Sequence, residues 1–502
     1  MTERAAGDAL ARDAYRGRDL TTLVNLVGGR HPEAEALVWV PFDGPRRSWS
    51  GPHLADAVRS RATGLQRRGV GRGDRVGLLM TNDPEFVISW LGIALSGAAA
   101  VCLNTRLSVP ELTWIAGHSG LAGLITSPAL QQTASEIGNL PWVETPNALN
   151  GGSEKWQAPD VDAFAPASIQ YTSGTTSRPK GVVWTQANCL WAAQVNAAHQ
   201  GLRDDDRYLV TLPLFHTNAL SYSLLGALFA GATVVLQPRF SASRFWQVSV
   251  DERCTWTSVV SFCLRALAAH AAPADHHYRG WSGSAVVPPK AVPGGIAVEG
   301  WFGMTETVSH PVCSVPGLPD EAGSMGRRAA EYEIQLRDVV GDVGDLWVRG
   351  VRGVSLFAEY LHDPEATAAA FDDQGWFRTK DRVRVGTSGS VHFHERDGDV
   401  LKVGGENIGA LEIEQVIRRV VGVADVAVVG RPDDLLGEVP VAFVQTTEPV
   451  GDLHDRIHQV CVEHLADFKQ PREIRLVDAL PRVTLEKVSK AELRRRLQEE
   501  HP

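Results

Sequence analysis

Residues 171–181, Y-T-S-G-T-T-S-R-P-K-G, concentrate hydroxyl side chains, a glycine and a lysine in one short stretch. Hydroxyls and backbone N–H groups bind phosphate oxygens, glycine lets the backbone approach an anion, and lysine adds positive charge. The stretch is not a Walker A loop, because no Ser or Thr follows the lysine. We therefore predict a polyphosphate-binding loop that uses Thr172, Ser173, Gly174, Thr175, Thr176 and Lys180.

The chain on both sides of this loop alternates short apolar stretches with amphipathic ones. R-V-G-L-L-M (75–80) and A-T-V-V-L-Q (232–237) are typical of buried strands. Alternation with helical patterns predicts an α/β fold with a mostly parallel sheet.

The pattern changes near residue 396 to that of a compact α+β unit, which suggests a large domain over 1–397 and a small one over 398–502. The helices and strands expected in the small domain are helix 410–421, strand 423–429, strand 439–445, helix 453–465 and strand 473–476.

Residues 86–103 are almost uncharged and about long enough to cross a bilayer. However, N-D-P-E (82–85) is typical of a helix cap with proline in the first turn, and Ser96-Gly97 of a helix end. We therefore predict a buried helix followed by a buried strand.

Composition narrows the range of functions. The 502 residues include 44% hydrophobic ones and carry a formal net charge of −10, which is typical of a globular protein and disfavours nucleic acid or an anionic membrane as partner. Six scattered cysteines without a C-x-x-C predict buried, reduced thiols rather than a zinc site or disulfides. The charged first residues lack an apolar segment, so we expect a cytoplasmic protein.

Further motifs follow the loop in a fixed order. They are G-M-T-E (303–306), W-F-R-T-K-D (376–381), R-D-G-D-V-L-K-V-G-G-E-N-I (396–408) and Lys487. Together with the loop they resemble the adenylate-forming superfamily, which includes acyl- and aryl-CoA synthetases, over residues 20–493. The resemblance implies a large N-terminal domain of layered, mostly parallel sheets with helices, and a small mobile α+β C-terminal domain. It also implies an ATP-dependent, AMP-forming ligase.

The resemblance assigns roles to residues around ATP. The loop would hold the β- and γ-phosphates, Thr305 the α-phosphate and Glu306 a Mg²⁺ ion. Phe302 would stack on adenine, with Ser284 also in the nucleotide site. Asp381 would bind the ribose hydroxyls, Arg396 would support ribose or phosphate, Lys487 would bridge the substrate oxyanion and the α-phosphate, and Gly398 would be the hinge.

The same resemblance suggests where the acid and its acceptor bind. His216 would orient the carboxylate, and Trp301, Met304 and Val308 would line the pocket, which suits an apolar or aromatic acid. Relatives that activate amino acids carry aspartate where this chain has His216, so an α-amino acid is disfavoured. Gly404 and Gly405 resemble the loop that lines the CoA tunnel, although a simple turn is the alternative. The expected partners are therefore an acid and CoA, with the protein as a monomer or homodimer.

Four departures from the superfamily keep alternatives open. Gly398 replaces Asp or Lys, Lys380 and Glu486 each replace a glycine, and the segment 286–300 is short. We expect ATP-dependent activation of a carboxylic acid as an acyl-adenylate with release of pyrophosphate, followed by transfer to CoA to give an acyl- or aryl-CoA. The alternatives are an amine acceptor, an inorganic oxyacid such as nitrite, or a non-catalytic nucleotide-binding protein.

Overall fold

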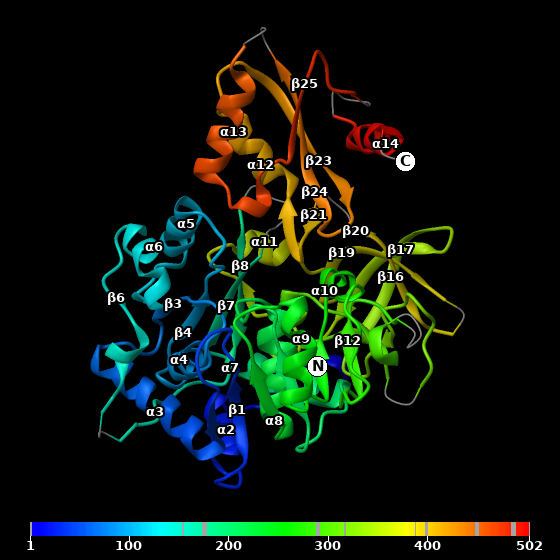
Figure 1. The fold of residues 1–502 in the computed structure, drawn as a ribbon. Helices are drawn as coiled ribbons and strands as arrows, with labels where there is room; N and C mark the ends of the chain where they lie inside the picture. The colour runs from blue at the N-terminus through cyan, green and yellow to red at the C-terminus, as the bar shows by residue number, and fades with distance from the viewer. Residues whose placement is uncertain are drawn as a thin grey trace. The chain divides into compact units, whose positions relative to one another are not determined.

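A computed structural model gives the fold (Figure 1) and describes residues 3–152, 155–172, 178–287, 292–315, 318–386, 388–396, 400–446, 451–482 and 488–500. Several predicted site residues lie outside the described residues, namely Ser173, Gly174, Thr175, Thr176, Gly398 and Lys487. The side chain of Arg396 also lies outside the described part.

The chain divides into two compact units. Unit 1 comprises residues 1–105, 116–171 and 181–395, and unit 2 comprises 106–115, 172–180 and 396–502. Two short internal segments therefore group with the C-terminal unit. The expected division after residue 397 stays a prediction.

Among the described residues, the largest sheet has nine strands in the order β15–β14–β13–β12–β11–β9–β10–β1–β2. Pairs from β1 across to β13 are parallel, while β2, β14 and β15 pair antiparallel at the two edges. The strands are β1 Glu35–Trp39, β2 Arg47–Ser50, β9 Arg207–Val210, β10 Thr233–Leu236, β11 Trp256–Ser258, β12 Gly280–Gly283, β13 Val298–Phe302, β14 Val312–Cys313 and β15 Arg327–Arg328.

A second sheet has seven strands over the described residues, in the order β18–β8–β7–β4–β3–β5–β6. Its central pairs are parallel, which confirms the predicted mostly parallel α/β fold. The strands are β3 Arg75–Leu79, β4 Ala99–Cys102, β5 Gly123–Thr126, β6 Val143–Glu144, β7 Pro166–Thr172, β8 Lys180–Thr185 and β18 Glu359–Tyr360.

Helices cover these sheets, and α2, α3 and α4 pack together beside them (Figure 1). The main ones are α1 Glu3–Asp13, α2 Leu20–Gly28, α3 Gly51–Arg67, α4 Pro84–Leu95, α5 Val109–Ser119, α6 Gln131–Glu136, α7 Gln186–His199, α8 Gly226–Ala230, α9 Ala242–Asp251, α10 Ser261–Leu267 and α11 Pro364–Ala369. Short 3₁₀ turns are η1 Pro128–Leu130, η2 Pro146–Leu149, η5 Pro293–Gly295 and η6 Thr305–Thr307. The element η3 Asn218–Leu225 is a π-helix of eight residues.

The apolar segment 86–103 forms a buried helix and strand, as predicted. Asp83 caps α4, because its side chain accepts a hydrogen bond from the backbone of Glu85, and Pro84 occupies the first turn. The helix ends before Gly97, whose φ of +90° suits glycine, and buried β4 follows. No helix within the described residues is long and apolar enough to span a membrane.

A small antiparallel sheet completes unit 1. Over the described residues it has four strands in the order β16–β17–β19–β20, which are β16 Glu333–Val340, β17 Val343–Arg349, β19 Trp376–Val385 and β20 Val391–Arg396. The predicted W-F-R-T-K-D motif lies on β19.

The C-terminal part of unit 2 is an α+β structure, as expected. Its described strands are β21 Val400–Val403, β22 Glu406–Gly409, β23 Val423–Asp433, β24 Gly437–Thr446 and β25 Glu473–Val477, and its helices are α12 Ala410–Ile417, α13 Leu453–His464, η7 Asp467–Lys469 and α14 Lys490–Glu500. Helix α12 ends four residues before the expected Val421, ahead of Gly422, whose φ is +100°.

Within unit 2, the segment 106–115 is attached by a buried ion cluster. The Lys469 ammonium lies 2.6 Å from a carboxylate oxygen of Glu111 and 2.6 Å from one of Glu412. Because burial disfavours the charged carboxylate, the pKa of Glu412 is raised despite the nearby lysine. Lys469 itself is 3% exposed, so the charged groups of this cluster meet in the interior of unit 2.

Candidate active site

The G-M-T-E motif forms a short loop directly after strand β13. Phe302 ends the strand, and the 3₁₀ turn η6 begins at Thr305. The Trp184 indole N–H donates to the Thr305 carbonyl at 2.8 Å, and the hydroxyls of Thr217 and Thr305 are 3.0 Å apart. Strand β8 and the segment before η3 therefore both fix the position of Thr305.

The same loop holds Glu306 in a buried position. Glu306 is 7% exposed, and its Oε1 accepts a hydrogen bond from the Tyr360 hydroxyl at 2.9 Å. Its backbone carbonyl accepts a hydrogen bond from the Phe357 N–H at 2.8 Å. The carboxylate is thus oriented by strand β18 and the residues just before it.

Glu306 suits a Mg²⁺ ion that is shared with a nucleotide. Mg²⁺ in nucleotide sites is commonly bound by one or two carboxylates together with phosphate oxygens and waters. Over the described residues, no group of three or more His, Cys, Asp or Glu side chains is arranged to hold a metal by itself. A single oriented carboxylate fits the first kind of site and not a protein-only metal site.

His216 lies next to the loop through its neighbour. Its backbone N–H donates to the Pro213 carbonyl, and the following residue, Thr217, is the one that touches Thr305. The His216 ring packs on Phe215 with centroids 4.7 Å apart. The structure therefore brings His216, Thr305 and Glu306 into one region of unit 1.

The predicted acid-pocket residues have different environments. Met304 is half-buried beside the loop, Trp301 is 7% exposed, and Val308 is fully buried. Val308 has a φ of +50°, which is rare for a β-branched residue and signals backbone strain. Their role as a pocket stays a prediction.

The predicted nucleotide residues lie on several elements of unit 1. Ser284 is exposed just after β12, and Phe302 is half-buried at the end of β13. Asp381 on β19 is 3% exposed, and its backbone N–H donates to the Thr379 hydroxyl. The preceding residue, Lys380, has a φ of +65°, a left-handed backbone conformation that glycine adopts without steric strain.

The two ends of the predicted phosphate loop are described. Thr172 ends β7 and Lys180 begins β8, and these strands are neighbours in the seven-stranded sheet. Tyr171 is fixed beside α5, because its hydroxyl is 2.7 Å from Nδ1 of His118. Burial raises the pKa of Tyr171, which keeps the phenol neutral.

Gly404 and Gly405 form the tight turn between β21 and β22. Val403 pairs with Glu406, so the hairpin has a two-residue turn, and the φ angles of the glycines are +59° and +93°. Two positive φ angles are what such a hairpin turn requires. Gly404 and Gly405 therefore form a tight turn, and a role in CoA binding remains a prediction.

Sequence reasoning missed the residues that position the loop. Trp184 and Tyr360 lie 121 and 54 residues from their partners, and both look like ordinary core aromatics in the sequence. Thr217 also positions the loop, and it alone had a signal in the sequence, because it is a polar residue next to the predicted His216 in the L-P-L-F-H-T-N stretch.

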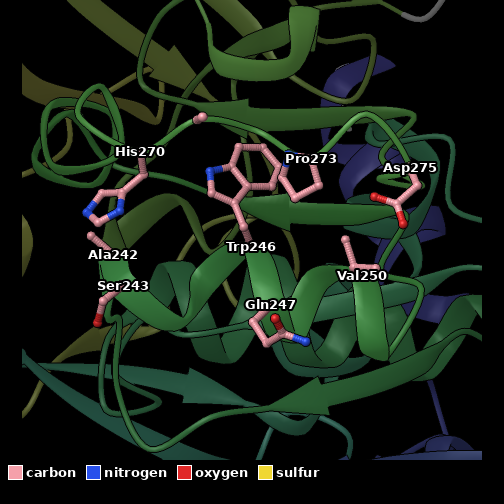
Figure 2. Close-up of a pocket in the computed structure, with 9 residues that line it drawn as sticks. Ala242, Ser243, Trp246, Gln247, Val250, His270, Pro273 and Asp275 are labelled. Atoms are coloured by element: carbon pink, nitrogen blue, oxygen red, sulfur yellow. The ribbon is translucent and has the colours of Figure 1, made fainter.

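A surface cavity of about 440 Å³ lies elsewhere in unit 1, between α9 and residues 270–275. Figure 2 shows Trp246 in its centre, between His270 and Pro273. None of its lining residues is one of the predicted site residues, so it is separate from the G-M-T-E loop.

Comparison with known proteins identifies the family of the chain. The AMP-binding enzyme family matches residues 26–361, and the AMP-binding enzyme C-terminal domain matches residues 412–487. The chain belongs to the AMP-binding enzyme family. It is an ATP-dependent, AMP-forming ligase of the adenylate-forming superfamily, as the motifs predicted.

Individual relatives include CoA ligases. Crotonobetaine/carnitine–CoA ligase from Salmonella typhimurium is 30% identical over 516 residues, covering 96% of this chain and all of that protein. A double mutant of o-succinylbenzoate CoA synthetase from Bacillus subtilis has a TM-score of 0.82 at 28% identity, covering 94% of this chain and 98% of its own. Amide bond synthetase McbA from Marinactinospora thermotolerans shares the fold, with a TM-score of 0.81 at 22% identity and coverage of 94% and 99%.

Proposed function

We propose that the protein activates a carboxylic acid with ATP and then transfers the acyl group to CoA. In the first step a carboxylate oxygen attacks the α-phosphorus of ATP, forming an acyl-adenylate and breaking the bond to pyrophosphate. In the second step the CoA thiolate attacks the acyl carbon, giving a thioester and AMP.

The observation that carries this proposal is the fixed position of Thr305 and Glu306. Both lie on a loop anchored by buried donors, Trp184 and Tyr360, at the end of a parallel strand. Phosphoryl chemistry needs alignment and charge neutralisation more than covalent help from the protein. When bound, Mg²⁺ supplies positive charge to the phosphates, and Glu306 would hold it.

Other residues of the proposed site bind and orient the nucleotide. Thr172 and Lys180 border the loop that would hold the β- and γ-phosphates, and Phe302 would contact the adenine. Asp381 would accept hydrogen bonds from the ribose hydroxyls, for which a carboxylate is suited. Arg396 would support ribose or phosphate.

His216 and Lys487 would act on the acid. Lys487 would lie between the carboxylate and the α-phosphate, offsetting their repulsion in the transition state. Lys487→Ala should reduce acid-dependent pyrophosphate release by roughly 10²-fold or more, yet convert a supplied acyl-adenylate to thioester. Loss of thioester formation with pyrophosphate release intact would contradict this role.

CoA as acceptor is supported by the relatives named above, two of which are CoA ligases by name. An amine acceptor is the second candidate, because the chain shares the fold of an amide bond synthetase. Supplying the enzyme with ATP, an activated acid, and either CoA or a panel of amines separates the two. Thioester without amide supports the proposal, and amide without thioester contradicts it.

Gly398 is proposed as the hinge between the two half-reactions. Proline fixes φ, so Gly398→Pro should preserve one half-reaction and lose most of the other. Equal loss of both, or no change in either, would place the pivot elsewhere.

A further inference from the structure

Three aromatic rings beside the G-M-T-E loop are packed against one another. Trp301 stacks on His310 with centroids 4.2 Å apart and planes 12° apart. Tyr222 packs on His310 at 4.1 Å and on Trp301 at 5.5 Å. Exposure is 0% for His310, 4% for Tyr222 and 7% for Trp301, so the three rings form a compact buried block, here called the ring cluster.

The ring cluster touches the loop directly. A Cβ atom placed on Gly303 would lie only 2.5 Å from the Tyr222 hydroxyl, so that hydroxyl packs against the Gly303 backbone. Ser221, the neighbour of Tyr222 on η3, donates to the Val308 carbonyl at 2.7 Å. Trp301 and His310 lie just before and just after the loop in the chain. The cluster therefore packs against the loop backbone at Gly303.

The ring cluster also contains buried polar atoms that have no hydrogen-bond partner among the described residues. Within the described part of the chain, neither ring nitrogen of His310 nor the Tyr222 hydroxyl has a hydrogen-bond partner. Burial and the neighbouring His199 hold the pKa of His310 well below its ordinary value, so the ring is neutral, with one donor and one acceptor nitrogen. Each unpaired buried polar group destabilises the folded protein.

Buried polar groups without a hydrogen-bond partner are rare in native proteins, so their presence here needs a physical reason. A small polar molecule that hydrogen-bonds with them would remove the cost. A large apolar acyl group would leave them unpaired and would also need the volume that the rings occupy.

We propose that the ring cluster limits the enzyme to small, polar carboxylic acids, such as hydroxylated or oxidised short-chain acids. Trp301 sets the size limit, and Tyr222 and His310 supply hydrogen bonds to the polar end of the acid. This inference rests on the proposed adenylating function and names the substrate class of the same site.

The first test is a panel of acids in ATP–pyrophosphate exchange with the wild-type protein. We expect kcat/KM for lactate or glyoxylate to exceed that for hexanoate and benzoate by about 10²-fold, because a rigid wall and unpaired polar groups both penalise the larger acids. Efficient exchange with hexanoate or benzoate would overturn the inference and leave the adenylating function intact. No exchange with any acid would contradict the proposed function itself.

The second test uses two variants. Trp301→Ala should raise kcat/KM for benzoate at least about 10-fold by emptying the space, and Tyr222→Phe should lower the preference for lactate over propionate by about 10-fold. Trp281→Ala is the matched control, because Trp281, which is 0% exposed against 7% for Trp301, belongs to a different hydrophobic cluster on β12 and should not widen the acid range.

Tyr222→Phe keeps the ring and removes one oxygen, so it tests the inference even if Trp301→Ala fails to fold. An unchanged ratio of lactate to propionate in Tyr222→Phe would refute the role of the hydroxyl. Benzoate activity that rises equally in Trp281→Ala and Trp301→Ala would refute the size limit.

Discussion

Glu299 on β13 lends itself to a quantitative prediction of pH-dependent stability. Burial raises its pKa from 4.5 to about 7, with Arg279 opposing and Asp320 adding to the shift. A raised carboxyl pKa means that the folded protein disfavours the ionised form. Stability is therefore unaffected below the unfolded pKa and is lost as pH rises towards the folded value.

The Glu299→Gln variant removes this loss. A shift of about 2.5 pKa units corresponds to at most about 3 kcal/mol, and partial exposure lowers this to roughly 1–2 kcal/mol of difference between about pH 5 and pH 8. The free energy of unfolding of Glu299→Gln, relative to that of the wild type, should therefore be larger by this amount at the higher pH than at the lower pH.

Urea unfolding followed by tryptophan fluorescence at the two pH values measures the difference. The transition that reports unit 1 is the relevant one, because the chain has two units and need not unfold in one step. If the gain in free energy of unfolding of the variant over the wild type is equal at both pH values, or larger at the lower pH, the reasoning is refuted.

Three further predictions concern other residues. Lys469→Met should destabilise unit 2 by roughly 3–5 kcal/mol in urea unfolding near neutral pH, because two buried carboxylates lose their shared cation; a change below about 1 kcal/mol would contradict the cluster's importance. Lys380→Gly should raise the unfolding free energy by about 0.5–1 kcal/mol, since its φ of +65° strains a side-chain-bearing residue, and a lower stability would contradict this. Tyr360→Phe should slow adenylation about 10-fold and also lower the melting temperature, because the buried Glu306 carboxylate loses a hydrogen-bond donor, and an unchanged rate would remove Tyr360 from the positioning of that group.

The local elements were predictable because their signals are local. Asp83 and Pro84 start α4 as the sequence indicated, and the small-domain strands fall close to their expected places. Apolar periodicity and capping act over a few residues, so one sequence is enough to detect them.

Long-range placement was not predictable in the same way. The grouping of residues 106–115 with the C-terminal unit depends on contacts such as Glu111 with Lys469, which are 358 residues apart. The left-handed backbone at Val308 and Lys380 contradicts the preferences of both residue types, so tertiary structure imposes it.

The candidate site also contains both predictable and unpredictable residues. The G-M-T-E motif indicated Thr305 and Glu306, because a distinctive short motif carries its own signal. The donors that orient them, Trp184 and Tyr360, are common core residue types with no signature of their own. The ring cluster became visible only when Tyr222 was placed beside His310.

The most direct test of the central claim is acid-dependent ATP–pyrophosphate exchange in wild type, Glu306→Gln and Glu299→Gln. Glu299 is the matched control, since it lies on the strand that leads into the loop but outside the proposed site. We predict exchange in wild type and in Glu299→Gln, with a loss of about 10²-fold or more in Glu306→Gln, because one oriented charge of the phosphoryl site is removed. Exchange in Glu306→Gln at the wild-type rate would contradict the account.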